Sequence, residues 1–163
     1  MTIRHVLSCF ICFLFALGGL LGQQFPDVTV KTLNRQSAQL SQYVGQGKTT
    51  VVAVWSTTCA NCIMELDNMK QYVEKWASEY NAEVVAVSQD QYDRVRRVRP
   101  LVSGRQWPYT VLIDDQRQLG ELLNFKAIPQ LFVVNGNGQI VKQYSAYRVG
   151  REEEVDQVLA TLK

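Results

Sequence analysis

The sequence predicts an α/β domain, built on a central mixed β-sheet with helices on both faces. Three observations lead to this prediction. Residues 49–55 (TTVVAVW) form a continuous β-branched run, as expected of a strand buried on both faces. Residues 62–80 carry an apolar stripe at helical spacing. Residues 131–134 and 139–144 flank an Asn-Gly-Asn-Gly turn, which is a strong hairpin signal.

The N-terminal part of the domain is expected to supply the first strands. Residues 25–33 alternate in part between apolar and polar side chains, which favours an edge strand. Residues 40–44 are typical of a short turn or helical piece, and Gly45-Gln46-Gly47 then breaks the chain before the buried strand at 49–55. A second buried strand is expected over residues 84–87 (VVAV).

Three helices are predicted along the middle of the chain. The stripe within residues 62–80 repeats every three or four residues, so its members share one helical face. These members are Cys62, Leu66, Met69, Val73, Trp76 and Tyr80. Residues 92–102 are expected to be helical, with Pro100 breaking or ending the helix because proline has no backbone N–H. A short helix is expected over residues 116–125.

The C-terminal part is expected to add strands at residues 109–113, 131–134 and 139–144, followed by a last helix. That helix has an apolar face formed by Val155, Val158, Leu159 and Leu162. Strands that are separated by helices pair in parallel, whereas the hairpin adds an antiparallel edge. The order of elements therefore predicts a mixed sheet.

The first 22 residues differ from the rest of the chain. After a short basic start, residues 6–21 carry no charged side chain over 16 positions. Such a run is typical of a secretory signal peptide, and Ala16-Leu17-Gly18 fits the cleavage rule best. The alternative is an uncleaved membrane anchor, although the run is shorter than the ~20 residues that a span needs. We predict a signal peptide or anchor over residues 1–22, one domain over 23–163, and a periplasmic or other extracytoplasmic location.

The charge of the chain does not favour nucleic-acid binding. The formal net charge is +2, and 20% of the residues are charged, which is ordinary for a globular domain. One basic cluster is present, and it consists of Arg94, Arg96, Arg97, Arg99 and Arg105. The cluster is either a solvated helix face or a docking patch for an acidic partner or a lipid headgroup.

The motif Cys59-Ala60-Asn61-Cys62 lies between the strand at 49–55 and the start of a predicted helix. Unpaired N–H groups and a partial positive charge at a helix N-terminus stabilise a thiolate. Because Cys62 belongs to the apolar stripe, we expect it to be partly buried and Cys59 to be more exposed. The exposed thiolate would attack a substrate disulfide, and the buried one would resolve the mixed disulfide. Two inert cysteines or a static disulfide are the alternative.

A metal or haem site is not expected. The other two cysteines, Cys9 and Cys12, fall in the leader, and the only histidine is His5. Zinc needs about four ligands, and attachment of a c-type haem needs a histidine directly after the second cysteine, where this chain has Ile63. We therefore predict no metal and no organic cofactor.

Two further residues are candidates for roles beside the dithiol. Glu65 falls three residues after Cys62; it is either an ordinary first-turn glutamate or a proton acceptor and donor for Cys62. Pro129 precedes the strand at 131–134, a position that suits proline because it cannot donate to a sheet. It could equally form a cis peptide with Ile128 beside the dithiol and present backbone to a substrate segment.

These motifs resemble the thioredoxin superfamily, in particular the exported bacterial thiol–disulfide oxidoreductases of the TlpA/ResA type. The resemblance covers about residues 25–163 and is carried by the strand ending at Trp55, the Cys59–Cys62 motif with Glu65, and Ala127-Ile128-Pro129. It implies a thioredoxin fold, a nucleophilic Cys59, a resolving Cys62 and a cis Pro129 facing them. It also implies that Glu65 is the active-site glutamate of this group.

The resemblance further implies how the site would work. Ile128, Pro129 and Trp55 would contribute to substrate binding, Trp55 being the aromatic residue on the strand before the motif. The substrates would be protein disulfides or dithiols, and the direction would be reduction. A membrane-bound electron donor would recycle the two cysteines.

Three positions depart from the pattern of the superfamily. Thr58 stands where tryptophan is usual, Asn61 where proline is common, and Ala53 where cytosolic thioredoxins keep a buried acid. Residues at these positions tune the stability of the thiolate, so no reduction potential is carried over to this chain.

Two rival functions remain open. A thiol peroxidase of the same superfamily would fit Ser56, which stands three residues before Cys59, but Val52 occupies the position where peroxiredoxins have proline. A thioredoxin-like binding module with an idle dithiol is the other rival. Peroxide consumption and the trapping of a mixed disulfide distinguish these rivals from the oxidoreductase.

Overall fold

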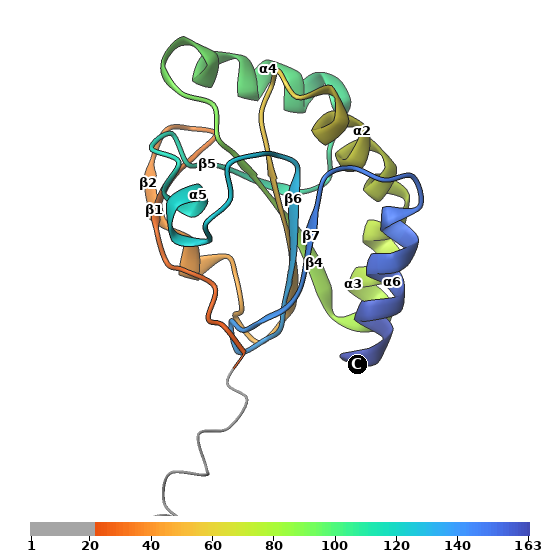
Figure 1. Ribbon diagram of the computed structural model, residues 1–163. Helices are drawn as coiled ribbons and strands as arrows, with labels where there is room; N and C mark the ends of the chain where they lie inside the picture. The colour runs from red at the N-terminus through yellow and green to blue at the C-terminus, as the bar shows by residue number, and fades with distance from the viewer. Residues whose placement is uncertain (1–21) are drawn as a thin grey trace, which may run out of the picture.

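A seven-stranded sheet forms the centre of the computed structural model, which describes residues 22–163 (Figure 1). Its strands are β1 (Thr29–Thr32), β2 (Ser37–Gln39), β3 (Thr49–Trp55), β4 (Ala82–Ser88), β5 (Thr110–Ile113), β6 (Gln130–Val134) and β7 (Ile140–Ser145). Their order across the sheet is β2-β1-β5-β4-β3-β6-β7. The strands β3, β4 and β5 are parallel to one another, and all other pairs are antiparallel. The predicted mixed sheet is confirmed.

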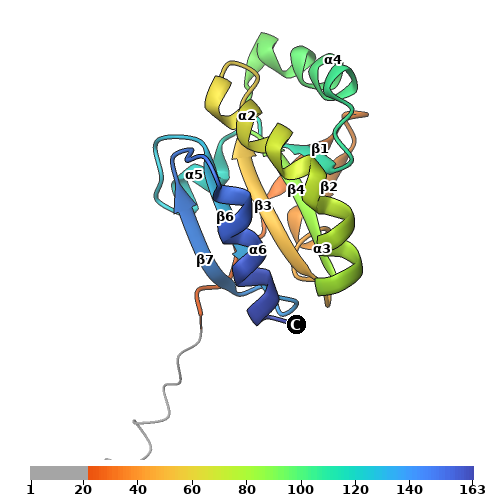
Figure 2. The same ribbon diagram turned by 90° about the vertical axis from the view of Figure 1, so that its right-hand side faces the viewer.

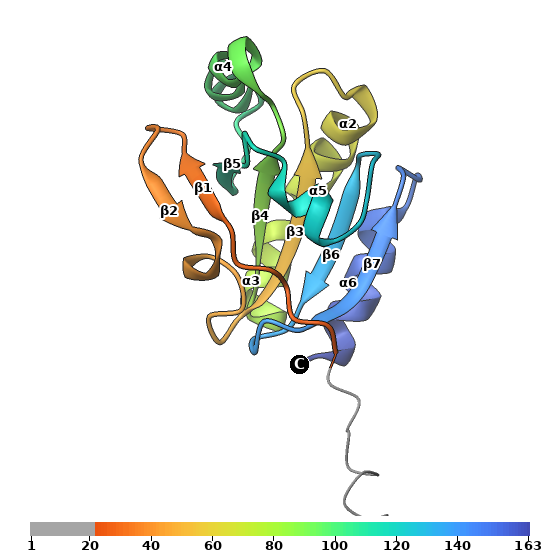
Figure 3. The same ribbon diagram turned by 60° about the vertical axis from the view of Figure 1, so that its left-hand side comes forward.

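The helices cover both faces of this sheet. They are α2 (Ala60–Met69), α3 (Val73–Tyr80), α4 (Val95–Arg105), α5 (Gln118–Leu122) and α6 (Arg151–Thr161), with 3-10 turns η1 (Leu40–Gln42), η2 (Lys70–Tyr72) and η3 (Tyr92–Arg94). Figure 2 shows α2, α3 and α6 together on one face, and Figure 3 shows α5 on the other. None of the helices in residues 22–163 is both long and apolar enough to cross a membrane.

Alternate residues of β3 point into two separate cores, as the period of a strand requires. Val51, Ala53 and Trp55 join the core under α2, α3, α4 and α6. Val52 and Val54 join the core under η1 and α5. All seven residues of β3 are buried, which explains the continuous β-branched run in the sequence.

The structure corrects three expectations about the elements. The strand in residues 25–33 is short and does not lie at the edge, because β2 pairs with its outer side. The helical stripe over residues 62–80 is divided into two α-helices by the 3-10 turn η2. The helix α4 continues through Pro100 to Arg105. Pro100 leaves the carbonyl group of Arg96 without its helical N–H partner. Both residues are exposed, so water can replace that partner and the helix can continue.

Most of the predicted leader, residues 1–21, lies outside the described residues. At Gln24 the described chain pairs with Gln139 beside the β6–β7 turn. Figures 1 and 3 show this start at one end of the sheet and α4 at the opposite end. The first turn of α2 lies at the same end as α4, because β3 and β4 are parallel and each leads into the helix that follows it.

Candidate active site

The loop from β3 into α2 carries the two cysteines, which form a disulfide. Cys59 is the N-cap residue of α2, with extended backbone at φ −98°, ψ 96°. The backbone N–H of Cys62 donates to Sγ of Cys59 over 3.2 Å. Sulfur thus takes the place of the side-chain oxygen that usually accepts such a bond at a helix start. The same N–H and the helix dipole would stabilise a thiolate on Cys59 in the reduced form.

The two sulfurs differ in access to solvent. Cys62 is 1% exposed, whereas Cys59 is half-buried at the start of the helix. The expected difference in burial is therefore present, and only Cys59 is open to a molecule in solution.

Asp90 fixes the loop that precedes Cys59, and sequence analysis did not identify it. Its carboxylate accepts hydrogen bonds from the N–H of Thr57 at 2.7 Å, the hydroxyl of Thr57 at 2.8 Å and the hydroxyl of Ser88 at 2.8 Å. Asp90 is only 1% exposed. The only signal in the sequence was the position of a polar pair, Ser88 and Asp90, directly after a run of buried apolar residues.

Ile128 and Pro129 lie beside the dithiol, on the loop between α5 and β6. The peptide bond between them is cis. The carbonyl oxygen of Ile128 is 4.0 Å from Sγ of Cys59. The carbonyl group of Pro129 accepts a hydrogen bond from the N–H of Ala146 at 3.2 Å. The backbone next to Cys59 is therefore that of Ile128, while the carbonyl group of Pro129 bonds to the residue that follows β7.

Trp55 lies beneath the site and not on its surface. The side chain is 1% exposed and packs edge-on against Trp107, with ring centroids 5.0 Å apart. Its Nε1–H has no partner among the described residues. This burial contradicts the expectation that Trp55 touches a substrate. The aromatic ring instead belongs to the core on which α2 rests.

Glu65 is buried at 3% exposure in the second turn of α2. Loss of contact with water raises the pKa of its carboxyl from 4.5 to about 7. The positive charge of Arg151 lowers this pKa by a smaller amount, and the negative charge of Glu152 raises it. This burial distinguishes Glu65 from a solvated glutamate in the first turn of a helix.

Arg151 is held at the start of α6 by packing and hydrogen bonds. Its guanidinium lies 4.4 Å from the centroid of the Tyr144 ring and donates to Glu154 and to the carbonyl oxygen of Ala146. The exposed fraction of Arg151 is 8%, and its Nε–H has no partner among the described residues. Arg151 and Glu152 were not identified as functional candidates from the sequence, because only the folded chain brings α6 close to α2.

No three His, Cys, Asp or Glu side chains within residues 22–163 come together in a way that could hold a metal ion.

Comparison with known proteins places this geometry in a family. A model of the AhpC/TSA family matches residues 21–143. The chain belongs to this family. Among curated relatives of this AhpC/TSA protein, thioredoxin-like protein YneN of Bacillus subtilis is 26% identical over 73% of this chain and 68% of its own length. Thiol:disulfide interchange protein DsbE of Haemophilus influenzae is 26% identical over 77% of this chain and 66% of its own length.

A solved structure supports the same assignment. An uncharacterized thioredoxin-like protein from Porphyromonas gingivalis is 30% identical, with a TM-score of 0.74 over 85% of this chain and 90% of that one. The thioredoxin-like fold expected from the sequence is confirmed. With the Cys59–Cys62 pair in place, this AhpC/TSA protein is a thioredoxin-like thiol–disulfide oxidoreductase.

Proposed function

We propose that this protein reduces disulfide bonds of protein substrates outside the cytoplasm, with Cys59 attacking and Cys62 resolving. The observation that carries this proposal is the difference between the two sulfurs. Cys59 is half-buried and its Sγ accepts the N–H of Cys62, whereas Cys62 is 1% exposed. An accessible, stabilised thiolate beside a protected second thiol is the arrangement that two-step exchange requires.

The exchange begins with the reduced dithiol. The Cys59 thiolate attacks one sulfur of a substrate disulfide, the substrate S–S bond breaks, and the leaving sulfur takes up a proton. Cys59 is then joined to the substrate in a mixed disulfide. Cys62 loses its proton and attacks Sγ of Cys59, which releases the second substrate sulfur as a thiol. Two electrons have passed to the substrate, and the product is the Cys59–Cys62 disulfide seen in the structure.

Glu65 would accept the proton of Cys62 in the second step. Glu65 and Cys62 are three residues apart on α2, so they are neighbours on one helical face, and both are buried. A carboxyl group whose pKa is about 7 can both accept and return a proton near neutral pH.

The backbone of Ile128 would hold the substrate next to Cys59. Its carbonyl oxygen is 4.0 Å from Sγ of Cys59 and lies on a loop that leads into β6. An extended substrate segment could add to this exposed backbone, as peptides add to sheet edges. The buried ring of Pro129 would shape this loop.

The location and the direction of electron flow belong to the same proposal. The uncharged run at residues 6–21 and the likeness to a DsbE protein support export, with residues 1–22 as a cleaved leader or a membrane tether. A reductant outside the cytoplasm needs an electron donor, and we propose a membrane protein in that role. Dithiol exchange itself requires neither a metal nor an organic cofactor.

A trapping experiment tests the two sulfur roles. Cys62→Ser protein should form a stable mixed disulfide with a disulfide-containing substrate protein, and Cys59→Ser protein should form none. A stronger adduct from Cys59→Ser than from Cys62→Ser would reverse the roles. The reduction potential of the pair, measured in thiol–disulfide buffers, tests the direction. A value near about −270 mV supports a reductant, and one near about −120 mV indicates an oxidant.

The peroxidase alternative gains no support from the site. The hydroxyl of Ser56 lies 3.0 Å from the hydroxyl of Thr58, and no hydrogen bond joins it to Cys59 among the described residues. Val52 is fully buried in the middle of β3. Consumption of hydrogen peroxide by the reduced protein, compared with Cys59→Ser, decides between the two activities.

A further inference from the structure

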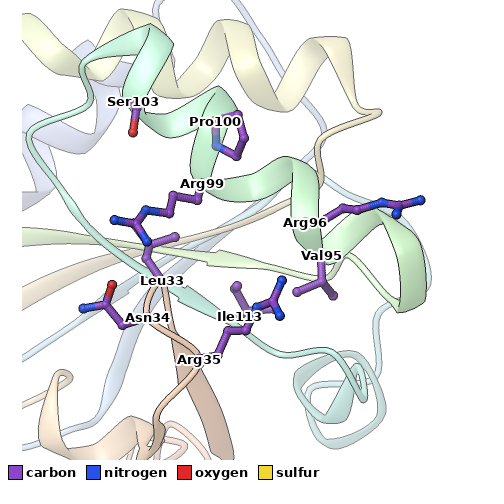
Figure 4. Close-up of a pocket in the computed structure, with 9 residues that line it drawn as sticks. All are labelled: Leu33, Asn34, Arg35, Val95, Arg96, Arg99, Pro100, Ser103 and Ile113. Atoms are coloured by element: carbon purple, nitrogen blue, oxygen red, sulfur yellow. The ribbon is translucent and has the colours of Figure 1, made fainter.

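A groove with a basic rim runs between α4 and the turn from β1 to β2. Its cavity has a volume of about 500 Å³. Leu33, Val95 and Ile113 form an apolar floor, and Arg35, Arg96 and Arg99 are the charged residues on its walls. No carboxylate lines this cavity. Figure 4 shows Arg35 reaching up from the turn and Arg99 reaching down from the helix, while Arg96 extends outward at one end.

The two central arginines are not neutralised within residues 22–163. Neither Arg35 nor Arg99 has a carboxylate oxygen within 4.0 Å or donates a side-chain hydrogen bond to another described residue, and both are exposed. Arg96, by contrast, is 3.4 Å from Asp93. Two free guanidinium groups over an apolar floor match a segment that carries carboxylates together with apolar side chains.

The groove and the dithiol lie beside different strands of the same sheet. The dithiol follows β3, and the groove lies beside β1 and β5, on the far side of β4. Three strand spacings separate β1 from β3, which corresponds to about 14 Å. An extended chain advances about 3.3 Å per residue, so a segment of roughly four to five residues covers this distance. A polypeptide that occupies the groove and also reaches Cys59 therefore needs at least this length between the two places.

The direction of the chain disfavours a membrane as the occupant. The described residues begin at Gly22, and Gln24 pairs with Gln139 near the β6–β7 turn, at the end of the sheet opposite α4 (Figures 1 and 3). A tether through residues 1–22 would leave from that end, which points the groove away from the bilayer.

We propose that this groove binds an acidic segment of the protein that exchanges disulfides with Cys59, and so selects acidic substrates. The inference rests on the proposed oxidoreductase function and adds a substrate class to it. Arg35 and Arg99 bind carboxylates of the substrate. The substrate cysteine that reacts with Cys59 lies four or more residues along the substrate chain from those carboxylates.

Peptides with one cysteine, linked to mercaptoethanol as a disulfide, test this proposal. One set carries four glutamates and the other four glutamines, joined to the cysteine by one, four or eight Gly/Ser residues. The reduced full-length protein should react about five- to tenfold faster with the glutamate peptides when the linker has four or eight residues, because rim charges chiefly raise association rates. The preference should be weaker with a single linker residue.

A matched pair of variants separates the groove from the overall charge. Arg35→Glu/Arg99→Glu and Arg94→Glu/Arg97→Glu each change the net charge by −4, but Arg94 and Arg97 do not line the cavity. The first variant should lose the preference for glutamate, and the second should keep it. Equal loss in both, or no preference in the wild-type protein at any linker length, would overturn the proposal. So would binding of anionic vesicles that depends on Arg35 and Arg99 without any preference among the peptides.

A small uncharged substrate distinguishes this failure from that of the oxidoreductase function. Hydroxyethyl disulfide should react at the same rate with the wild-type protein and with both variants. If the wild-type protein does not reduce it, the proposed function fails, and the selection of substrates by the groove fails with it. If the protein reduces hydroxyethyl disulfide but reacts equally fast with the glutamate and glutamine peptides, only the groove proposal fails.

Discussion

Asp90 and Thr57 are joined by two hydrogen bonds, and together they fix the loop that leads to Cys59. The N–H of Thr57 donates to one carboxylate oxygen at 2.7 Å, and its hydroxyl donates to the other at 2.8 Å. Because Asp90 is 1% exposed, water does not compete for these bonds. The carboxyl end of β4 thus determines where the chain enters α2.

Replacing Asp90 should destabilise the protein and misplace the nucleophile. Asp90→Ala leaves the N–H of Thr57 and the hydroxyl of Ser88 without their acceptor. We expect the free energy of unfolding of the oxidised protein to fall by about 2–3 kcal/mol, as for lost hydrogen bonds to a charged group. Urea unfolding measures this loss.

An exposed aspartate nearby provides the control. The side chain of Asp93 is 82% exposed, so Asp93→Ala should change stability by no more than about 0.5 kcal/mol. Similar losses in the two variants would show that Asp90 has no special role in holding the loop.

The buried Glu65 should make stability depend on pH. Its pKa in the folded protein, about 7, lies above the ordinary value of 4.5. Between these pH values the folded state binds more protons than the unfolded state, so stability falls as pH rises through this window. Glu65→Gln removes the effect. It should be more stable than the wild-type protein by about 3 kcal/mol at pH 8, and the difference should vanish near pH 4.

Urea unfolding of both oxidised proteins at several pH values measures this difference. A constant gap between Glu65→Gln and the wild-type protein across this range would show that Glu65 titrates normally.

The sequence predicted the elements whose signals are local. The strand β3 matches its expected range, 49–55. Its residues are buried on both faces, and a strand of this kind is recognised in a sequence by a run of β-branched side chains. The hairpin formed by β6 and β7 was equally clear from the Asn-Gly-Asn-Gly turn. The apolar stripe also predicted that Cys62 is more buried than Cys59, because Cys62 belongs to the stripe.

Features that depend on tertiary contacts were not predictable. The outer position of β2 depends on pairing with β1, and a strand of three residues has too little pattern to detect. Trp55 ends a run that the sequence already indicated to be buried, but only the packing against Trp107 shows that its ring belongs to the core. The charges that act on Glu65 come from Arg151 and Glu152, more than 80 positions away in the chain.

Trp55 should matter for stability and not for substrate binding. Trp55→Phe keeps most of the packing against Trp107 and removes an N–H that has no partner in the described residues. It should therefore cost far less stability than Trp55→Ala, for which we expect a loss of about 3–5 kcal/mol. The rate of exchange with a disulfide peptide should be the same for Trp55→Phe and the wild-type protein. A rise in KM for the peptide in Trp55→Phe, without a loss of stability, would show that Trp55 contributes to substrate binding.

Arg151 and Glu152 should shift the titration of Glu65 in opposite directions. The guanidinium of Arg151 lowers the pKa of Glu65, and the carboxylate of Glu152 raises it. Arg151→Met preserves an apolar contact with Tyr144 but removes the charge, so the pKa of Glu65 should rise above 7. Glu152→Gln removes a like charge, so the pKa should fall.

Carboxyl carbon NMR of Glu65 in the oxidised protein measures both shifts directly, with circular dichroism to confirm that α6 is intact. If the mixed disulfide is resolved through Glu65, the midpoint of the pH profile for that step should move with the measured pKa in each variant. Shifts of the NMR titration in the same direction for both variants would show that a structural change, and not the charges of Arg151 and Glu152, controls the proton on Glu65.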